Sequence, residues 1–576
     1  MRDIKILLLD PRHNTRGLHS NFVPINIGYI GEFLKNEIKN INLELEITTE
    51  PEEIFRLLRN WRPDIVGVSN YVWNSSLSNL ICDYAKKKNS NTLCILGGPE
   101  FPAGTGARDI KNTIYDQTYD KSFKYLINRP SVDFFTYSDG EVAFLDLVKN
   151  FIDNNNSVKS MKLADEPMKG CASISKDKKK LLIGKYIPRI GMDGSIKAHG
   201  RDVIPSPYTT GLLDKFLNGK FVPSFETARG CPYACTFCSS RRSGLGLRSV
   251  ENILEELDQI AANMNSKGEK GLIQFVDDTL TFNRKRSIEL FEKMKARKYN
   301  AHFLCLTRAN TIATTNGRED DLVFARLMKE VGFVQISFGI ESGNPGINEE
   351  MQKGVTLDHY RRAYEILDAV GVEERRGSFI IGHPHETEKT IQDSINFAKE
   401  LKIHRTSVNI MTPYPGTMVY DQARLGKGLY FEKGATDFSN FRRWGNSVVS
   451  TDELSPQALQ YWHRRFLAEA YSSSTSVKHS IKEFVSGNRS HFFHRPVLKA
   501  VRDRFDLVKQ KQWTTPPRFS RPDHSNYNPD EWGKAHITKT DCINAFKSLY
   551  DMKNRKVRDK SQNLSAADLE ATQISA

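Results

Sequence analysis

Blocks of apolar and polar residues alternate regularly along the first 150 residues of the chain. Short apolar runs predict strands, and the segments between them repeat apolar positions at helical spacing. The predicted strands lie at 4–9, 43–47, 65–69, 93–96 and 132–137, and the predicted helices at 27–34, 51–58, 77–87 and around 145–148. Apolar strands that alternate with helices are typical of a parallel sheet covered on both faces. We therefore expect an α/β domain over residues 1–150, with a ligand site at the carboxyl ends of its strands.

The same alternation of strand and helix patterns returns about six times in residues 221–430. Strands are predicted near 224–228, 272–276, 303–307, 334–338, 378–381 and 407–411, with helices between them. This pattern predicts a full or partial βα barrel. The loops that follow barrel strands form the active face, so we expect the residues that carry chemistry there.

The other two parts of the chain have weaker patterns. Residues 151–220 lack clear periodicity and are expected to connect the two domains. Residues 431–576 predict a mostly helical C-terminal region, with helices at 459–471 and 542–547 and a disordered polar tail from residue 556. No run approaches roughly 18 consecutive apolar residues, so no membrane span is expected.

Composition narrows the class of protein. Hydrophobic residues make up 39% of the chain and charged residues 26%, which fits a soluble globular protein. The formal net charge is +14, but no nucleic-acid-binding motif accompanies it, so a solvated basic surface is favoured over a nucleic-acid partner. The eight cysteines are too unevenly spread for a disulfide framework, which predicts a reducing, cytoplasmic location.

Three of the cysteines crowd into one segment directly after the first predicted barrel strand. Cys231, Cys235 and Cys238 follow the spacing C-x3-C-x2-C. Three thiolates in a short loop suit an iron–sulfur cluster, and one iron would then keep an open position. The alternative is a zinc ion held by three cysteines and a histidine, but the nearest downstream histidine is His302, far along the chain.

The cysteine segment resembles that of the radical S-adenosylmethionine (SAM) superfamily, in which this motif follows the first strand of a βα barrel. The resemblance implies that Cys231, Cys235 and Cys238 ligate a [4Fe–4S] cluster whose open iron binds SAM. It further implies that an electron from the cluster cleaves SAM to a 5′-deoxyadenosyl radical, which abstracts hydrogen from the substrate. Phe237 matches the aromatic position that lies beside the SAM adenine.

Residues at the later strand ends match further motifs of this family. The resemblance implies that Asp277 accepts hydrogen bonds from the SAM ammonium and that Arg308 pairs with the SAM carboxylate. Glu341 or Ser342, in the run Gly-Ile-Glu-Ser-Gly, would bond the ribose hydroxyls, and Gly382 begins a turn similar to G-x-P-x-E-T on the adenine side. Each residue alone also fits an ordinary role in solvation, a salt bridge or a turn. Their order on successive strand ends supports one SAM site.

Two other features stand at the last strand ends. His383 and His385 share the turn of Gly382 and are candidates for acid–base groups, although partly exposed loop histidines are the more ordinary interpretation. The sixth strand ends in a run from Thr412 to Thr417 that is similar to the family's P-x-P-G-T turn.

A parallel sheet in front of such a barrel resembles the cobalamin-binding class of the superfamily. Residues 1–150 are then expected to form a Rossmann-like, cobalamin-binding-type domain before a partial six-stranded radical SAM barrel. The resemblance implies cobalamin contacts at Ser69, Gly97 and Gly98, because paired glycines after a strand admit a bulky ligand. An ordinary βα turn would also use these glycines.

One motif of cobalamin domains is not met. Many of them supply a cobalt-ligating histidine through D-x-H-x-x-G, whereas here Asp10, His13 and Gly17 are each spaced one residue too far apart. Members of this radical SAM class often lack that histidine, so the departure leaves cobalamin open.

The resemblance implies cobalamin-dependent methylation, or a related cyclisation or rearrangement, of a small molecule or natural-product intermediate. SAM would serve as radical source and as methyl donor, and an external flavodoxin- or ferredoxin-type protein would supply electrons. One alternative is a tRNA-modifying methylthiotransferase, although Cys82, Cys94 and Cys171 do not follow successive strand ends as a second cluster would require. The other alternative is a non-catalytic, metal-bound scaffold, which the set of strand-end motifs disfavours.

Overall fold

The computed structural model describes most of the chain from residue 3 to residue 528. The residues outside the description within this span are 13, 16–17, 20–21, 72, 100–121, 138, 188–199, 241–244, 266–270, 315–317, 415, 437–439, 442–445, 472–493, 511 and 514–516. The expected helix at 542–547 and the polar tail lie outside the described residues. Within the described part, no helix has both the length and the apolar character needed to cross a membrane.

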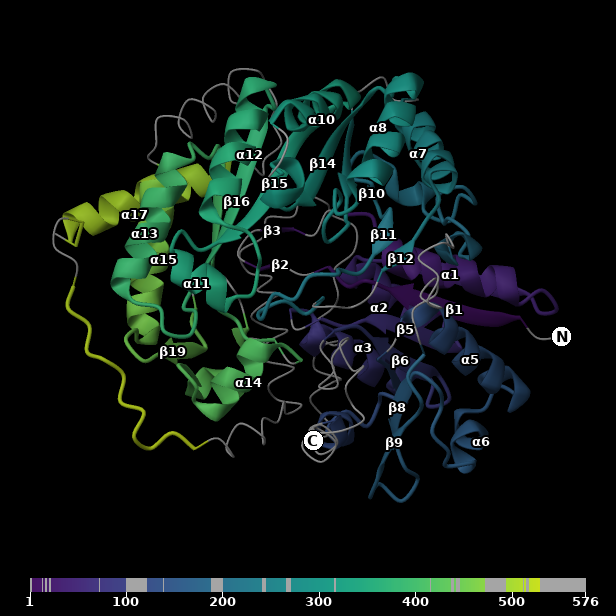
Figure 1. Ribbon diagram of the computed structural model, residues 1–576. Helices are drawn as coiled ribbons and strands as arrows, with labels where there is room; N and C mark the ends of the chain where they lie inside the picture. The colour runs from purple at the N-terminus through teal and green to yellow at the C-terminus, as the bar shows by residue number, and fades with distance from the viewer. Residues whose placement is uncertain are drawn as a thin grey trace.

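A seven-stranded sheet forms the N-terminal domain, in the order β4-β1-β5-β6-β7-β8-β9 (Figure 1). The first five strands in this order pair in parallel, and β8 and β9 are antiparallel. The strands are β1 (Ile4–Leu9), β4 (Leu43–Thr48), β5 (Ile65–Ser69), β6 (Leu93–Gly97), β7 (Phe134–Thr136), β8 (Cys171–Ile174) and β9 (Leu181–Ile183). The helices are α1 (Ile25–Glu37), α2 (Pro51–Asn60), α3 (Ser75–Lys88), α5 (Gly140–Asp153) and α6 (Val158–Leu163).

Strand β1 shows why this sheet is covered on both faces. Ile6 and Leu8 pack into one hydrophobic cluster, and Leu7 and Leu9 pack into the other. Successive side chains of a strand point to opposite faces, so an unbroken apolar run needs helices on both sides. The expected α/β domain is confirmed. Its five parallel strands have the order 2-1-3-4-5 in chain sequence, which places the topological switch point between β1 and β5.

The sheet extends beyond residue 150 into the segment expected to be a connector. Strands β8 and β9 complete its edge, and Phe135 of β7 pairs with Ala172 of β8. Strands of three or four residues are too short to show a clear period of two, which explains why the sequence pattern did not reveal them. The rest of the segment contains the short 3-10 turns η2 (Gly200–Val203) and η3 (Asp214–Phe216).

Six parallel strands form the second domain, in the order β10-β13-β14-β15-β16-β17 (Figure 1). They are β10 (Ser224–Phe225), β13 (Gly271–Phe275), β14 (Ala301–Thr307), β15 (Phe333–Glu341), β16 (Glu374–Ile381) and β17 (Arg405–Ile410). Outside them lie α7 (Val250–Asn265), α8 (Arg284–Arg297), α10 (Arg318–Val331), α12 (Leu357–Ala369) and α13 (Glu388–Glu400), with short α9 (Ala309–Ile312) and α11 (Pro345–Glu350) in loops. Because β10 and β17 do not pair, the barrel is partial, as expected.

Aromatic side chains from neighbouring strands hold the barrel together. The ring of Phe275 lies 4.4 Å from Phe225, 5.8 Å from Phe303 and 5.2 Å from Phe333, measured between ring centroids. All four rings are fully buried. Burial of one such side chain stabilises the fold by roughly 1.5–3 kcal/mol, so this cluster fixes the first strands relative to each other.

The C-terminal region covers the open edge of the barrel. It contains α14 (Met418–Leu425), a hairpin of β18 (Leu429–Phe431) and β19 (Val449–Thr451), α15 (Pro456–Ala470) and α17 (His494–Lys509). Helix α15 packs beside β17, where His463 hydrogen-bonds the carbonyl of Val408 at 3.0 Å and the Tyr471 hydroxyl donates to the carbonyl of Thr406 at 2.6 Å. These contacts satisfy carbonyls of the last strand, and among its described residues the C-terminal region is mostly helical, as expected.

Candidate functional site

The cysteine loop follows β11 (Ala228–Arg229), which pairs with β12 (Gly246–Leu247). Cys231 and Cys235 are buried and Cys238 is half-buried. The backbone of Thr236 anchors the middle of the loop, because its N–H donates to Met351 and its carbonyl accepts from Met418, each at 3.0 Å. The loop is therefore tied both to the segment after β15 and to the start of α14.

The three cysteine sulfur atoms lie within electrostatic range of one another. Burial, together with Asp278 and the neighbouring thiols, raises the pKa of Cys238 to about 12, and burial also raises the pKa of Cys231. The free thiols of Cys231 and Cys238 are therefore protonated at neutral pH. Positively charged iron would be needed to keep them as the thiolates that bind metals.

The donor set of this loop fits an iron–sulfur cluster. In the described part of the chain, no group of three or more His, Cys, Asp or Glu side chains could hold a single metal ion. The sulfurs of one tetrahedral zinc site would lie only about 3.8 Å apart, given a Zn–S bond of about 2.3 Å. Three thiols in one short loop are the soft donors that an iron–sulfur cluster takes as thiolates, so the donor set suits a cluster.

A buried ion pair lies next to the cysteine loop. Lys353 donates from Nζ to Glu341 Oε1 at 3.1 Å, and both side chains are buried. The same ammonium lies 6.0 Å from the ring centre of Phe237. Burial works against the charge of Lys353, but the Glu341 carboxylate raises its pKa above the usual range. The structure thus brings the predicted adenine and ribose residues together and adds a lysine between them.

Glu341 has an unusual backbone conformation at the end of β15. Its φ of 70° lies in the left-handed region that residues other than glycine rarely adopt. Such conformations are found preferentially at functional sites. The next residue, Ser342, is fully buried, and its hydroxyl contacts Ser394 at 3.2 Å and accepts from the Asn344 N–H at 3.1 Å. Ser342 therefore stabilises the turn, and the contact of Glu341 or Ser342 with the ribose stays a prediction.

Asp277 lies beneath the segment that leads into the cysteine loop. Its carboxylate accepts from the Thr227 N–H at 3.1 Å, the Thr227 hydroxyl at 2.6 Å and the Ala228 N–H at 2.9 Å. Burial raises the pKa of Asp277 to about 6. The structure gives this carboxylate a role in holding the loop, and its contact with SAM stays a prediction.

The turn after β16 holds buried polar groups beside Phe237. Gly382 has a φ of 86°, and its N–H and that of His383 both donate to one carboxylate oxygen of Glu386. His383 is buried, in contrast to the expected exposed loop histidine, and burial lowers its pKa to about 3. In the described structure, His383 Nε2 and Glu386 Oε1 have no hydrogen-bond partner. Such groups could bind the polar edge of an adenine, which fits the predicted adenine side.

The pKa of Glu386 gives a testable dependence on pH. Burial raises it to about 8, although the backbone N–H groups of Gly382 and His383 lower it. The pKa of Glu386 is higher in the folded protein than in the unfolded chain, where it is near 4.5. Its protonated form therefore contributes fully to stability below pH 4.5, and this contribution is lost as the pH rises through 8. Glu386→Gln, which cannot ionise, is therefore expected to be more stable than the wild-type protein at pH 9, by on the order of a few kcal/mol.

Thermal melts of both proteins at pH 5, 7 and 9 check this expectation. The gap between the two melting temperatures should widen as the pH rises. An equal pH dependence in both proteins would contradict the raised pKa. Glu388→Gln, two residues further along in exposed sequence, is the matched control and should follow the wild type.

A second prediction concerns Glu341. Glu341→Ala is expected to leave the iron content intact and to weaken SAM binding tenfold or more, because a hydrogen bond to a charged group contributes about 1.5–3 kcal/mol. Anaerobic calorimetry with SAM measures the change. The control is Glu373→Ala, which removes an exposed partner of Lys329. An unchanged SAM affinity in Glu341→Ala would show that this carboxylate does not contact the cofactor.

The predicted cobalamin residues lie at the carboxyl edge of the N-terminal sheet. Ser69 is paired with Gly97 in the sheet, and its hydroxyl donates to the carboxylate of Asp10. A Cβ on Gly97 would come within 2.4 Å of Thr136 Oγ1, and one on Gly98, with a φ of 140°, within 2.2 Å of the Asn70 carbonyl oxygen. The protein's own packing therefore requires both glycines, and their contact with cobalamin stays a prediction. His13 lies outside the described residues.

Two aromatic residues after β5 extend from this edge towards the barrel. Tyr71 and Trp73 stack with ring centroids 4.6 Å apart and an angle of 7° between the rings. Trp73 and Phe237 pack against the same hydrophobic cluster, which is built from residues 411–449. The ligand edge of the sheet and the active face of the barrel thus meet at one aromatic surface.

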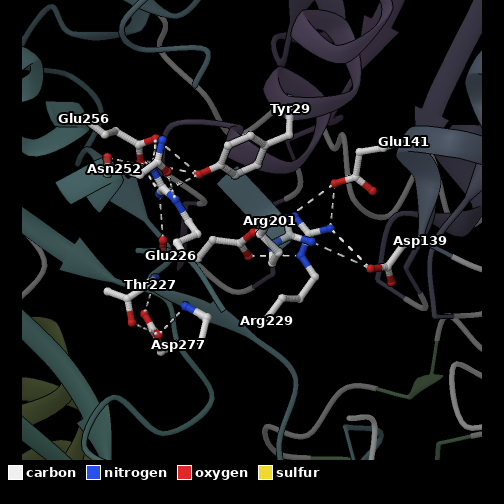
Figure 2. A network of polar contacts seen from close by, with 12 residues as sticks. Tyr29, Asp139, Glu141, Arg201, Glu226, Thr227, Arg229, Asn252, Glu256 and Asp277 are labelled. Atoms are coloured by element: carbon white, nitrogen blue, oxygen red, sulfur yellow. Dashed lines mark hydrogen bonds and ion pairs between the residues drawn. The ribbon is translucent and has the colours of Figure 1, made fainter. Parts of the chain in front are cut away.

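An interdomain clasp joins the two domains and consists of the five charged residues Asp139, Glu141, Arg201, Glu226 and Arg229 (Figure 2). Arg201 lies 2.6 Å from Glu226 and 3.6 Å from Glu141, and Arg229 lies 2.8 Å from both of these carboxylates. Asp139 approaches Arg229 at 3.8 Å. Because Arg229 stands two residues before Cys231, the clasp connects the cysteine loop to the N-terminal sheet.

Tyr29 of α1 makes a second contact between the domains (Figure 2). Its hydroxyl donates to Glu256 at 3.3 Å and accepts from Arg248 Nη1 at 3.1 Å. Arg248 also donates to the carbonyl of Glu226 at 2.8 Å. This contact reinforces the interdomain clasp from the side of α7.

Several of these residues were not identified from the sequence. No local motif marks Lys353, Arg201 or Glu226 in the sequence. Glu386 belongs to the G-x-P-x-E-T turn, but it was not singled out there as a site residue. Lys353 precedes Gly354, whose φ is 67°, in the loop after β15. The sequence signal that could have identified Lys353 was its position next to a turn glycine in a loop of the active face.

A comparison with protein-family models identifies the second domain. Residues 225–398 match the model of the radical SAM superfamily. The chain carries a radical SAM domain. The matched span runs from β10 to α13 and includes the cysteine loop, Arg308 and the Glu341–Lys353 pair. Radical SAM domains bind a [4Fe–4S] cluster and SAM, so the site built here is an enzyme active site.

Relatives of known name and structure extend the similarity over both domains. The chain is 28% identical over 434 residues to the uncharacterized methyltransferase PH0819 of Pyrococcus horikoshii, covering 73% of this chain and 84% of that protein. It is 23% identical over 466 residues to the cobalamin-dependent radical SAM methyltransferase TokK of Streptomyces tokunonensis, and this match covers 75% of this chain and 62% of that protein.

Two solved structures share the fold. The cobalamin-dependent SAM radical enzyme OxsB matches with a TM-score of 0.58 at 16% identity, over 96% of this chain and 79% of that chain. The radical SAM methyltransferase TsrM from Kitasatospora setae matches with a TM-score of 0.57 at 13% identity, over 82% of this chain and 89% of that chain. Both support the arrangement of a Rossmann-like sheet followed by a partial barrel.

Proposed function

We propose that this chain is a cobalamin-dependent radical SAM methyltransferase that acts on a small molecule. The observation that carries the proposal is the meeting of the cysteine loop with the carboxyl edge of the N-terminal sheet, through the interdomain clasp and the shared aromatic surface. The names of TokK and PH0819 support methyl transfer, and the cobalamin in the OxsB structure supports the second cofactor.

The residues that would hold SAM lie around Phe237. Its ring and the buried groups of His383 and Glu386 would receive the adenine, and Glu341, which pairs with Lys353, would accept hydrogen bonds from the ribose hydroxyls. When bound, the cluster supplies the electron that cleaves SAM to the 5′-deoxyadenosyl radical. The buried side chains of Glu341, Lys353 and His383 would exclude water from their side of the site.

Cobalamin would lie at the switch point of the N-terminal sheet, where open α/β sheets bind their ligands. Asp10 follows β1 there, and Ser69 ends β5. Burial raises the pKa of Asp10, while its bond with Ser69 lowers it. When bound, cobalamin supplies the methyl group, and Trp73 would separate it from solvent on the side of the barrel.

The proposed enzyme needs single electrons from outside. A flavodoxin- or ferredoxin-type protein is the proposed donor, since the chemistry begins with reduction of the cluster. The free cysteines of the described chain support a reducing, cytoplasmic compartment, in which the cluster ligands stay available.

Retention of cobalamin tests this proposal. The full chain is reconstituted anaerobically with iron and sulfide, mixed with hydroxocobalamin and passed through a gel-filtration column. We expect corrin absorbance to elute with the protein at about one per chain. The variant Cys235→Ala should retain the same amount of corrin, because the substituted residue lies outside the N-terminal sheet. Loss of all corrin from the wild-type protein would reject cobalamin while leaving the radical SAM assignment in place.

The methylthiotransferase alternative lacks support from the N-terminal domain. Cys82 lies in α3, Cys94 in β6 and Cys171 in β8, all buried within the hydrophobic clusters. Burial raises the pKa of Cys171 above its usual range. These thiols lie on three separate elements inside the hydrophobic clusters and not together in one loop, unlike Cys231, Cys235 and Cys238.

A further inference from the structure

Arg308 contacts the cysteine loop directly. Its Nη1 lies 3.8 Å from Cys235 Sγ, within hydrogen-bond range for sulfur. The carbon at the centre of the guanidinium lies 3.6 Å from the ring centre of Tyr233, so the group stacks on that ring. Its Nη2 donates to the carbonyl of Lys353, and its Nε approaches Asn310 Oδ1 at 3.4 Å. Each of the three nitrogens therefore has a partner in the protein.

The sequence predicts that Arg308 pairs with the SAM carboxylate, and that pairing stays a prediction. Arg308 is 7% exposed as a whole residue, and its guanidinium lies between the cysteine loop and the Lys353–Gly354 turn. Tyr233 and Cys235 belong to the same C-x3-C-x2-C segment. The stack on one residue and the contact with the other hold the positive charge against one cysteine sulfur.

We propose that Arg308 is a positioning residue that raises the reduction potential of the cluster by acting through Cys235. The proposal rests on the proposed function, because it requires a cluster at the three cysteines. The step concerned is the uptake of one electron, from dithionite or the external donor, with no bond formed or broken. That electron adds negative charge to the centre, and a buried cation next to a ligating sulfur stabilises the reduced form.

Other charges around the loop do not replace Arg308. Lys353 has its ammonium paired with Glu341, so much of its charge is compensated. Asp278 is exposed and negatively charged, and it acts on Cys231 and Cys238, which opposes reduction. Among the described residues, Arg308 is thus a cation in direct contact with a cysteine of the loop.

Midpoint potentials of the reconstituted full-length protein, measured by EPR-monitored redox titration without SAM, test the proposal. We expect Arg308→Met and Arg308→Gln to disfavour reduction at least tenfold, which lowers the midpoint by about 59 mV or more for one electron. Arg308→Lys keeps the charge and should stay closer to the wild type. Arg284→Met removes an arginine that pairs with Asp321 on the outer helices and should leave the potential unchanged.

The outcomes separate this inference from the proposed function. A wild-type protein that holds no cluster contradicts the proposed function itself. The inference is overturned if Arg308→Met keeps a normal iron content and an unchanged midpoint potential. If that variant also loses affinity for SAM, Arg308 binds the SAM carboxylate, as the sequence predicts. If both neutral variants lose the cluster, the variant Tyr233→Leu tests the inference instead. This change loosens the guanidinium of Arg308, which stacks on Tyr233, and should lower the midpoint potential while the iron content stays intact. An unchanged midpoint potential in Tyr233→Leu overturns the inference.

Discussion

Replacing Cys235 with alanine is expected to abolish cluster binding and SAM cleavage together. The variant loses one of the three thiolates of the loop, and two cysteines cannot hold a cube of four irons securely. Arg308 would also lose its sulfur partner at 3.8 Å. The reconstituted variant should contain almost no iron, show no brown colour and release no 5′-deoxyadenosine from SAM under reducing conditions.

The matched control is Cys305→Ala. Cys305 is buried in β14 and 1% exposed, so the control removes a buried thiol of the same domain without touching the loop. It should keep about four irons per chain and the wild-type rate of 5′-deoxyadenosine formation. Wild-type iron content in Cys235→Ala would refute the assignment of this residue as a cluster ligand.

Replacing Glu226 with alanine is expected to give the largest loss of stability. Glu226 is the shared partner of Arg201 and Arg229 in the interdomain clasp, and the Arg201 side chain is only 1% exposed. Although burial opposes ionisation, the two guanidinium groups lower the pKa of Glu226 to about 2. Removing it leaves a buried charge without its nearest partner, which costs about 3–5 kcal/mol.

Thermal unfolding and the rate of iron loss measure this effect. The melting temperature should fall by several degrees, and iron should leave Glu226→Ala faster, because Arg229 no longer fixes the start of the cysteine loop. Glu251→Ala is the control, since it breaks an exposed pair with Lys293 that contributes at most about 1 kcal/mol. Equal melting temperatures for the two variants would show that the interdomain clasp does not stabilise the junction.

The sequence predicted those parts of the fold that depend on local pattern. The strands from 271 to 410 were located to within a few residues, because their buried apolar residues alternate with less buried ones at the period of two that marks a strand. The cysteine loop was found because its spacing is itself a chemical motif. Phe237 and Glu341 stand in short motifs and were found with it, and the structure places both beside Lys353.

The sequence could not predict contacts that depend on distant parts of the chain. Glu141, Arg201 and Arg229 are 60 and 28 residues apart in order along the sequence, and the folded junction alone brings them together. Short strands such as β8 and β9 have too few residues to show an alternation of apolar and polar positions in the sequence. The expected partners of Arg308 and Asp277 were taken from the family pattern, whereas the structure shows both side chains holding the cysteine loop.

Formation of 5′-deoxyadenosine from SAM tests the central claim most directly. The full chain, reconstituted anaerobically with iron and sulfide and reduced with dithionite, is incubated with SAM, and the products are separated by liquid chromatography with mass detection. We predict 5′-deoxyadenosine in the wild-type protein and none in Cys235→Ala. A wild-type protein that holds about four irons per chain yet releases no 5′-deoxyadenosine, with or without added cobalamin, would contradict the account.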